Sequence, residues 1–142
     1  MMKNQLGTDH TVAIVEDDAG TRSLLAEVVN QAPGFRCVEP CASAEVAMLA
    51  LVTDPPEIVL MDIKLPGVSG IQCVRHLKPK IPQTHFLMLT TYEEANGIFD
   101  ALAAGAVGYL LKREAPEKLT AALTEVVQGG SPMSSLVARK VV

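Results

Sequence analysis

The sequence is poor in aromatic residues and cysteine, and it has no long hydrophobic segment. It contains no Trp, two Tyr and three Phe among 142 residues, so its core must be mostly aliphatic. Three cysteines, an odd number without a Cys-x-x-Cys pair, argue against a disulfide framework and favour reduced thiols in a cytoplasmic protein. The longest apolar run, residues 101–111, is far shorter than the ~20 residues of a membrane-spanning helix. The N-terminus lacks the hydrophobic block of a signal peptide, so we expect neither secretion nor membrane binding.

Positive charge is also in deficit. Sixteen Asp and Glu against twelve Lys and Arg give a formal net charge of −4, which disfavours a chain that coats nucleic acid or an anionic membrane. Hydrophobic residues make up 49% of the chain, enough for the core of one domain. Cys37, Cys41 and either His76 or His85 are metal-ligand residue types, but their loose spacing and the missing fourth ligand favour ordinary buried thiols.

Short apolar runs alternate with stretches of helical spacing about five times along the chain. Four of the runs have no polar interruption, which is typical of strands covered on both faces in a parallel sheet. These runs are residues 12–15, 58–61, 86–89 and 107–111. A fifth run, residues 35–39, is more polar and precedes Pro40, which favours an edge strand.

The stretches between these runs carry helix start and stop signals. The start signals are Ser43, Ser69, a capping box from Thr91 to Glu94, and Pro116. The stop signals are Pro33-Gly34, residues 54–56, Pro79 with Pro82, Gly105 and Gly129-Gly130. The resulting βαβαβαβαβα order predicts an α/β fold, a flavodoxin-like doubly wound five-stranded parallel sheet with strand order 2-1-3-4-5 and five helices.

Polar residues follow the predicted strands where a fold of this kind places its sites, at the carboxyl ends near strands 1 and 3. In chain order, strand 1 (residues 12–15) is followed by Glu16-Asp17-Asp18, and strand 3 (58–61) is followed by Asp62. Strand 4 (86–89) is followed by Thr90, and strand 5 (107–111) by Lys112. Two carboxylates ~4 Å apart repel by roughly 4 kcal/mol at an effective dielectric constant near 20. A divalent cation removes this cost, and oxygen ligands alone select Mg²⁺ or Mn²⁺.

A carboxylate beside a cation site, a hydroxyl and an ammonium group suits phosphoryl transfer to the carboxylate. Asp62 stands alone at the end of the central strand and is the predicted acceptor, because aspartate forms acyl phosphates. Lys112 would neutralise phosphoryl oxygens and Thr90 would donate a hydrogen bond to one. Glu16 and Asp17 are the predicted metal pair, whereas Asp18 directly precedes a helix and fits a capping role.

These residues resemble the receiver domain of two-component response regulators over residues 10–128. The resemblance lies in four segments, residues 15–18, 60–70, 89–90 and 104–112. It implies that Asp62 accepts a phosphoryl group from a sensor histidine kinase, with Mg²⁺ held by Glu16, Asp17, Asp62 and the backbone carbonyl of Lys64. Thr90 and Lys112 would bind the phosphoryl group.

The resemblance also implies a switch and a subfamily. Tyr109 would turn inward as Thr90 moves. This would change the face made by strand 5 and by helix 4, the helix expected between Thr91 and Gly105, and that face would control a transcriptional output domain. Gly97, expected inside helix 4, would weaken that helix by about 1 kcal/mol relative to Ala. Arg113 follows the lysine where many receivers have Pro, as in regulators of the NarL/FixJ type.

The remaining expectations concern the tail and the alternatives. Residues 9–128 are the predicted receiver domain, and 129–142 resemble the start of a linker toward a LuxR-type DNA-binding domain that this chain lacks. DNA binding would occur only through that domain, and Ser134 could cap a short helix in the tail. Catalysis is expected only on the chain's own acceptor. A stand-alone receiver and a phosphate-independent interaction module stay open, as does a homodimer through helix 1 or helix 5.

Overall fold

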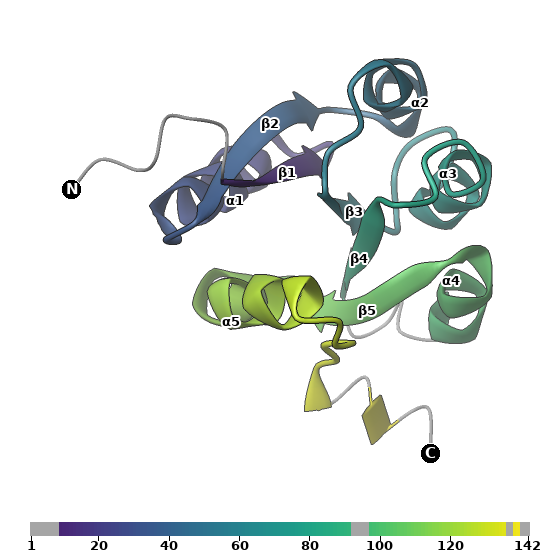
Figure 1. Ribbon diagram of the computed structural model, residues 1–142. Coiled ribbons are helices and arrows are strands. Elements are labelled where there is room, and N and C mark those ends of the chain that lie inside the picture. Colours follow the sequence, from purple (N-terminus) through teal and green to yellow (C-terminus); the bar gives the residue numbers. More distant parts are fainter. Residues whose placement is uncertain (1–8, 92–96, 136–137, 140–142) are drawn as a thin grey trace.

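The computed structural model describes residues 9–91, 97–135 and 138–139, and these form a five-stranded parallel sheet between two layers of helices (Figure 1). The strands are β1 His10–Val15, β2 Phe35–Cys41, β3 Ile58–Asp62, β4 His85–Thr90 and β5 Ala106–Leu111. The helices are α1 Ala19–Gln31, α2 Ala44–Thr53, α3 Gly70–Leu77, α4 Ile98–Ala104 and α5 Ala115–Val127, with a 3₁₀ turn, η2, over Lys112–Glu114. The strand order β2-β1-β3-β4-β5 confirms the predicted flavodoxin-like fold.

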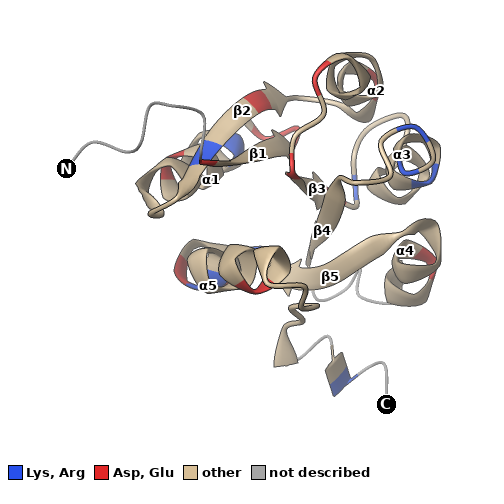
Figure 2. Ribbon diagram, viewed as in Figure 1, with Lys and Arg blue, Asp and Glu red and all other residues tan. Residues whose placement is uncertain are grey.

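Two apolar clusters, one on each face of the sheet, hold the layers together. Helices α1 and α5 cover one face, and α2, α3 and α4 cover the other (Figure 1). Neighbouring residues of each central strand enter opposite clusters because strand side chains alternate between faces. Figure 2 shows β3, β4 and β5 almost free of charged residues along their length. This two-sided burial explains why the central strands are continuous apolar runs.

Strand β2 lies at the edge of the sheet, as its sequence predicts. Arg36, Glu39 and Pro40 are exposed, whereas every residue of β3 is buried. Glu39 has a φ of 43°, and the register of β1 with β2 shifts between Val12 and Ile14. An irregular, polar edge of this kind discourages pairing with another chain.

The helix-capping predictions are confirmed at α1, α2 and α3. Asp18 accepts a hydrogen bond from the amide of Thr21 at 2.8 Å, and Ser43 accepts one from Val46 at 3.1 Å. Ser69 and Gln72 form a full capping box. The capping box predicted from Thr91 to Glu94 lies partly outside the described residues.

One sequence-based expectation is corrected, and another falls partly outside the described residues. Gly97, expected inside helix 4, is instead a 3₁₀ residue at the N-cap position of α4, which begins at Ile98. Ser134 directly precedes helical Ser135, where the sequence predicts a cap, and its hydroxyl donates to Glu114 at 2.6 Å; the amides that a cap at this position would bind, those of residues 136 and 137, lie outside the described residues. The tail turns helical here, since the amide of Ala138 donates to the Ser134 carbonyl at 2.8 Å.

The described helices are too short or too polar to cross a lipid bilayer. The longest of them, α1 and α5, have 13 residues each, and α5 carries charged residues on its exposed side.

The two-sided core makes a stability prediction. Leu60→Ala should lower the free energy of unfolding by about 3 kcal/mol, because Leu60 is fully buried in β3 and its loss leaves a cavity. Leu49→Ala is the matched control, since Leu49 is 78% exposed on α2 and its truncation should change stability by less than ~0.5 kcal/mol. Urea denaturation followed by circular dichroism measures both. Equal losses in the two variants would contradict the assigned core.

Candidate functional site

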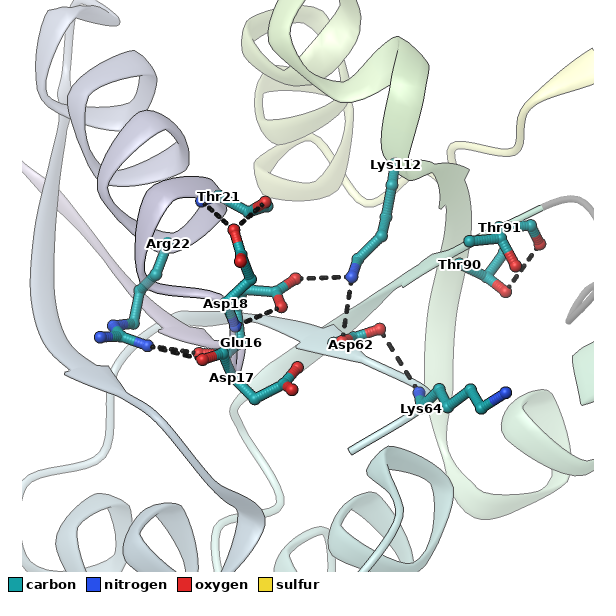
Figure 3. A network of polar contacts seen from close by, with 10 residues as sticks. All are labelled: Glu16, Asp17, Asp18, Thr21, Arg22, Asp62, Lys64, Thr90, Thr91 and Lys112. Carbon is teal, nitrogen blue, oxygen red and sulfur yellow. Dashed lines mark hydrogen bonds and ion pairs between the residues drawn. The ribbon is translucent and has the colours of Figure 1, made fainter. Parts of the chain in front are cut away.

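The site lies where β1, β3 and β5 end. Lys112, directly after β5, places its Nζ 2.8 Å from Glu16 Oε1 and 3.1 Å from Asp62 Oδ2 (Figure 3). The sheet register brings these ends together, since Val15 pairs with Met61, and Asp62 with Leu89 in the neighbouring strand. In the sequence, Glu16 lies 46 positions and Lys112 lies 50 positions from Asp62. The three residues nevertheless share one ion-paired cluster, as the sequence predicted.

The acidic loop after β1 divides its carboxylates between different partners. Glu16 is fully buried, and its second oxygen, Oε2, accepts a hydrogen bond from the amide of Asp18 at 3.0 Å. Asp18 turns back to Thr21, whose amide and hydroxyl both donate to it, and these bonds lower the pKa of Asp18. Asp17 is exposed, and its carboxylate extends toward the Asp62 side of the site (Figure 3). The structure therefore separates Asp18 from the other two acids.

Arg22 supports this loop and was not anticipated from the sequence. Its Nη1 donates to the carbonyl oxygen of Glu16 at 2.8 Å and to that of Asp17 at 3.5 Å (Figure 3). The guanidinium thus fixes the backbone that carries both acids. A lone arginine one turn into a helix gives no sequence signal for this role, because many exposed helical arginines contact only solvent.

Burial and like charge dominate the electrostatics of Asp62. Burial raises the pKa of Asp62 to about 6, and the neighbouring Glu16 adds to the shift, against the opposing effects of Lys112 and of the Lys64 amide. Burial lowers the pKa of Lys112, but its hydrogen bonds to Glu16 and Asp62 outweigh burial and raise it. The lysine therefore stays protonated at neutral pH. One ammonium group faces two buried carboxylates, which leaves negative charge for a cation to neutralise.

Three carboxylates fit a hard divalent cation. Ligand oxygens of Glu16, Asp17 and Asp62 all lie within 4.8 Å of one another. Within the part of the chain that the structure describes, these three acids are close enough to share an ion. Cys37 and Cys41 form no such group with a histidine there. An all-oxygen set with one exposed member suits Mg²⁺, which prefers carboxylates and retains several waters. The donor chemistry therefore fits the predicted ion, with Glu16, Asp17 and Asp62 as the residues to hold it.

The loop between β3 and α3 is packed tightly around Asp62. The amide of Lys64 donates to Asp62 Oδ1 at 3.3 Å. A Cβ on Gly70 would lie 2.0 Å from the backbone oxygen of Asp62, so only glycine allows α3 to begin there. Gly67 has a φ of +78°, a left-handed conformation that favours glycine. The predicted role of the Lys64 carbonyl as a metal ligand stays a prediction.

Glu45 is a second residue that the sequence did not reveal. It lies in the first turn of α2, and its Oε2 accepts a hydrogen bond from the amide of Val68 at 3.2 Å. The same oxygen would be 2.6 Å from a Cβ on Gly67. An acid in a first helical turn is explained by the helix dipole alone, so this contact with the loop after β3 has no sequence signature.

Thr90 is the last residue of β4, and Tyr109 lies within β5, the neighbouring strand. Thr90 is 1% exposed, and its hydroxyl donates to the carbonyl of Thr91 at 3.0 Å (Figure 3). Tyr109 is fully buried in this structure, and its hydroxyl lies 3.7 Å from the position of a Cβ on Gly97. The tyrosine ring therefore already points inward, under the start of α4.

Comparison with known proteins agrees with this geometry. The family model of the response regulator receiver domain matches residues 12–124, a span that includes every site residue named above. The chain belongs to the response regulator receiver family. The match starts within β1 and ends within α5, so the family covers the whole sheet and both helical layers.

The similar proteins are bacterial transcriptional regulators. A transcriptional activator protein, ExaE, of Pseudomonas putida is 31% identical over 118 residues, 83% of this chain and 55% of that protein. An uncharacterized transcriptional regulatory protein, YxjL, of Bacillus subtilis is 28% identical and aligns with 92% of this chain and 60% of its own length. A crystal structure of a LuxR-family two-component response regulator from Aurantimonas superposes with a TM-score of 0.86 at 28% identity, over 92% of this chain and 94% of that one. The chain thus spans about half the length of the curated relatives it matches.

The close approach at Gly70 generates a prediction for this receiver. Gly70→Ala should lower the free energy of unfolding by about 2 kcal/mol, because the new methyl group meets the Asp62 backbone and the loop must shift. Gly20→Ala is the matched control, since its Cβ would meet only an Asp18 oxygen at 3.5 Å within helix α1. Denaturant unfolding and the amide chemical shifts of Asp62 and Lys64 report the effect. Unchanged shifts and stability in Gly70→Ala would contradict the described packing.

Proposed function

We propose that this receiver is phosphorylated on Asp62 by a sensor histidine kinase in a Mg²⁺-dependent reaction, and that the phosphoryl group controls a transcriptional output domain. The observation that carries the proposal is the contact of Asp62 with Lys112, 3.1 Å apart, beside two further carboxylates within metal-sharing distance. The transcriptional regulators among the relatives support the output.

Asp62 is the nucleophile in this reaction. One of its carboxylate oxygens forms a bond to phosphorus while the bond from phosphorus to the kinase histidine nitrogen breaks, and the released imidazole keeps the electron pair and takes up a proton. The Lys64 amide and the Lys112 ammonium hold the two carboxylate oxygens in fixed directions. Mg²⁺ bound by Glu16, Asp17 and Asp62, with the Lys64 carbonyl, would neutralise charge on the acceptor and on the transferred oxygens.

Lys112 changes partners during transfer. It bonds Glu16 and Asp62 in this structure, and its raised pKa keeps all three of its protons available. A phosphoryl group on Asp62 carries three acceptor oxygens, one of which replaces the carboxylate oxygen now held by Lys112. Positive charge preorganised beside the acceptor stabilises the charge that spreads over these oxygens in the transition state.

Thr90 couples the phosphoryl group to the output face. Its hydroxyl leaves the Thr91 carbonyl and donates to a phosphoryl oxygen, and this move favours the inward position of Tyr109. The two arrangements of Thr90 bias the face made by α4 and β5, which carries the output.

The proposed function extends to the substrate range of the chain, its C-terminal tail and its location in the cell. The chain acts only on its own acceptor, and the short loop of three residues after β1 supports this part of the proposal. Residues 129–142 begin a linker toward a DNA-binding domain, and DNA is contacted through that domain alone. The protein works in the cytoplasm, where its three free thiols stay reduced. A homodimer through α1 or α5 stays a prediction.

Phosphorylation of Asp62 is tested with acetyl phosphate and Mg²⁺. The native chain should gain one phosphoryl group per molecule, and Asp62→Asn should gain none while keeping its circular dichroism spectrum, because the amide is not a nucleophile. Mass spectrometry of the intact chain counts the groups. Labelling of Asp62→Asn at the native level would refute the assignment, continuous turnover would indicate an enzyme, and no labelling of the native chain would indicate a phosphate-independent module.

The metal assignment is tested by two neighbouring acids. Asp17→Asn should weaken Mg²⁺ binding at least ~10-fold and slow labelling, since it removes a charged ligand oxygen from the three-acid group. Asp18→Asn is the matched control, because Asp18 is engaged with Thr21, and it should leave the Mg²⁺ affinity within about twofold. Isothermal calorimetry gives both affinities. The opposite ranking would move the metal site by one residue.

A further inference from the structure

The free edge of β5 holds a segment of the tail. Strand β5 is the last in the sheet order, so one of its edges has no neighbouring strand of the sheet. The chain leaves α5 and returns beside that edge (Figure 1). The amide of Tyr109 donates to the Pro132 carbonyl at 2.9 Å, and the amide of Ser134 donates to the Tyr109 carbonyl at 2.9 Å. Met133 and Tyr109 form a parallel bridge, so residues 132–134, here called the strap, occupy the position of a sixth strand.

Side chains as well as backbone hold the strap in place. Ser134 is 3% exposed, and its hydroxyl donates to Glu114 Oε1 at 2.6 Å. Pro132 is buried, and Met133 packs against the apolar cluster that contains Tyr109. The flanking Ser131 and Ser135 are exposed. Pro132 and Ser134 are thus buried and Met133 is partly buried where the strap meets β5, between two exposed serines.

Gly108 makes this approach sterically feasible. A Cβ on Gly108 would lie 2.3 Å from the Pro132 carbonyl oxygen and 3.0 Å from Leu87 Cδ1. Any other residue at position 108 would push the strap away from the strand. The predicted strand pattern around Gly108 gave no reason for a glycine, since glycine weakens a strand interior, whereas close approach of another backbone explains it.

One residue joins the strap to the switch. The Tyr109 backbone carries both strand-like hydrogen bonds to the strap, while the Tyr109 side chain is fully buried under the start of α4. Met133 shares the apolar cluster with that ring. An outward turn of the ring would change the apolar cluster against which Met133 packs and disturb the strand edge that pairs with Pro132 and Ser134.

We propose that the edge of β5 at Gly108 and Tyr109, together with Glu114, is a docking site for the strap, and that docking and the inward position of Tyr109 stabilise each other. The link from Tyr109 to Asp62 rests on the function proposed above. Because coupling between two equilibria is reciprocal, a phosphoryl group on Asp62 tightens the strap, and loss of the strap weakens binding of a phosphoryl group. The helix that starts after Ser134 is then oriented by the state of Asp62.

Docking is tested by amide hydrogen exchange on the full chain, followed by NMR. The amides of Tyr109 and Ser134 should exchange at least ~10-fold more slowly than that of exposed Ser131, because both are hydrogen-bonded between strap and strand. Ser134→Ala should speed exchange of both by about 5-fold, as expected when one buried hydrogen bond is lost. Ser135→Ala, next to it but exposed, should change neither. Equal exchange at Ser131 and Ser134 in the native chain would overturn the docking site.

Coupling is tested by titrating the chain and both variants with beryllium trifluoride, a phosphoryl mimic, in the presence of Mg²⁺. Ser134→Ala should bind about 3- to 5-fold more weakly than the native chain, Ser135→Ala should bind equally, and binding should slow exchange of the Ser134 amide further. Equal affinities of Ser134→Ala and Ser135→Ala, with normal acetyl phosphate labelling, would overturn the coupling and leave the proposed function standing. A native chain that neither binds the mimic nor is labelled would overturn the proposed function and the coupling together.

Discussion

The ammonium group of Lys112 bridges two buried carboxylates, and the architecture of the site depends on this bridge. Glu16 follows β1 and Asp62 ends β3, and the two carboxylates would repel each other without it. The bridge requires β5 to end level with β1 and β3, which parallel pairing through β4 achieves. Burial and the charge of Glu16 raise the pKa of Asp62 to about 6 despite this single positive charge, so the free site holds its acceptor incompletely compensated. That deficit is what makes the site responsive to a cation and a phosphoryl group.

Much of this arrangement could be predicted from the sequence, because long-range order in a parallel sheet follows from local patterns. Buried strands can be recognised in the sequence as unbroken apolar runs. Right-handed crossovers then connect the strands in parallel, so that their carboxyl ends lie at the same edge of the sheet. Asp62 and Lys112 could therefore be placed together although 50 residues separate them. The capping roles of Asp18 and Ser69 were also legible, since each stands directly before a helix.

The contacts that could not be predicted join side chains to backbone atoms of distant loops. Three unpredicted hydrogen bonds join Arg22 to the Glu16 carbonyl, Glu45 to the Val68 amide and Ser134 to Glu114. Each of these side chains is of a common polar type that occurs in many surroundings. The local sequence around Arg22, Glu45 and Ser134 fits a solvent-exposed residue or a helix cap equally well, so it does not predict the distant partner. Gly97 was placed inside helix 4 because the Thr91–Glu94 pattern predicted an earlier start, whereas α4 begins at Ile98 and Gly97 offers no capping side chain.

The cysteines, unimportant for the site, define where the protein can be labelled. Cys41 and Cys73 are buried, and burial raises their pKa to about 11 and about 12, so almost no reactive thiolate exists at neutral pH. Cys37 is half-buried on β2, the sheet edge opposite to the strap. A fluorophore attached there would stand a full sheet width from the tail, away from Asp62, and would serve as a fixed reference for measuring how the tail moves.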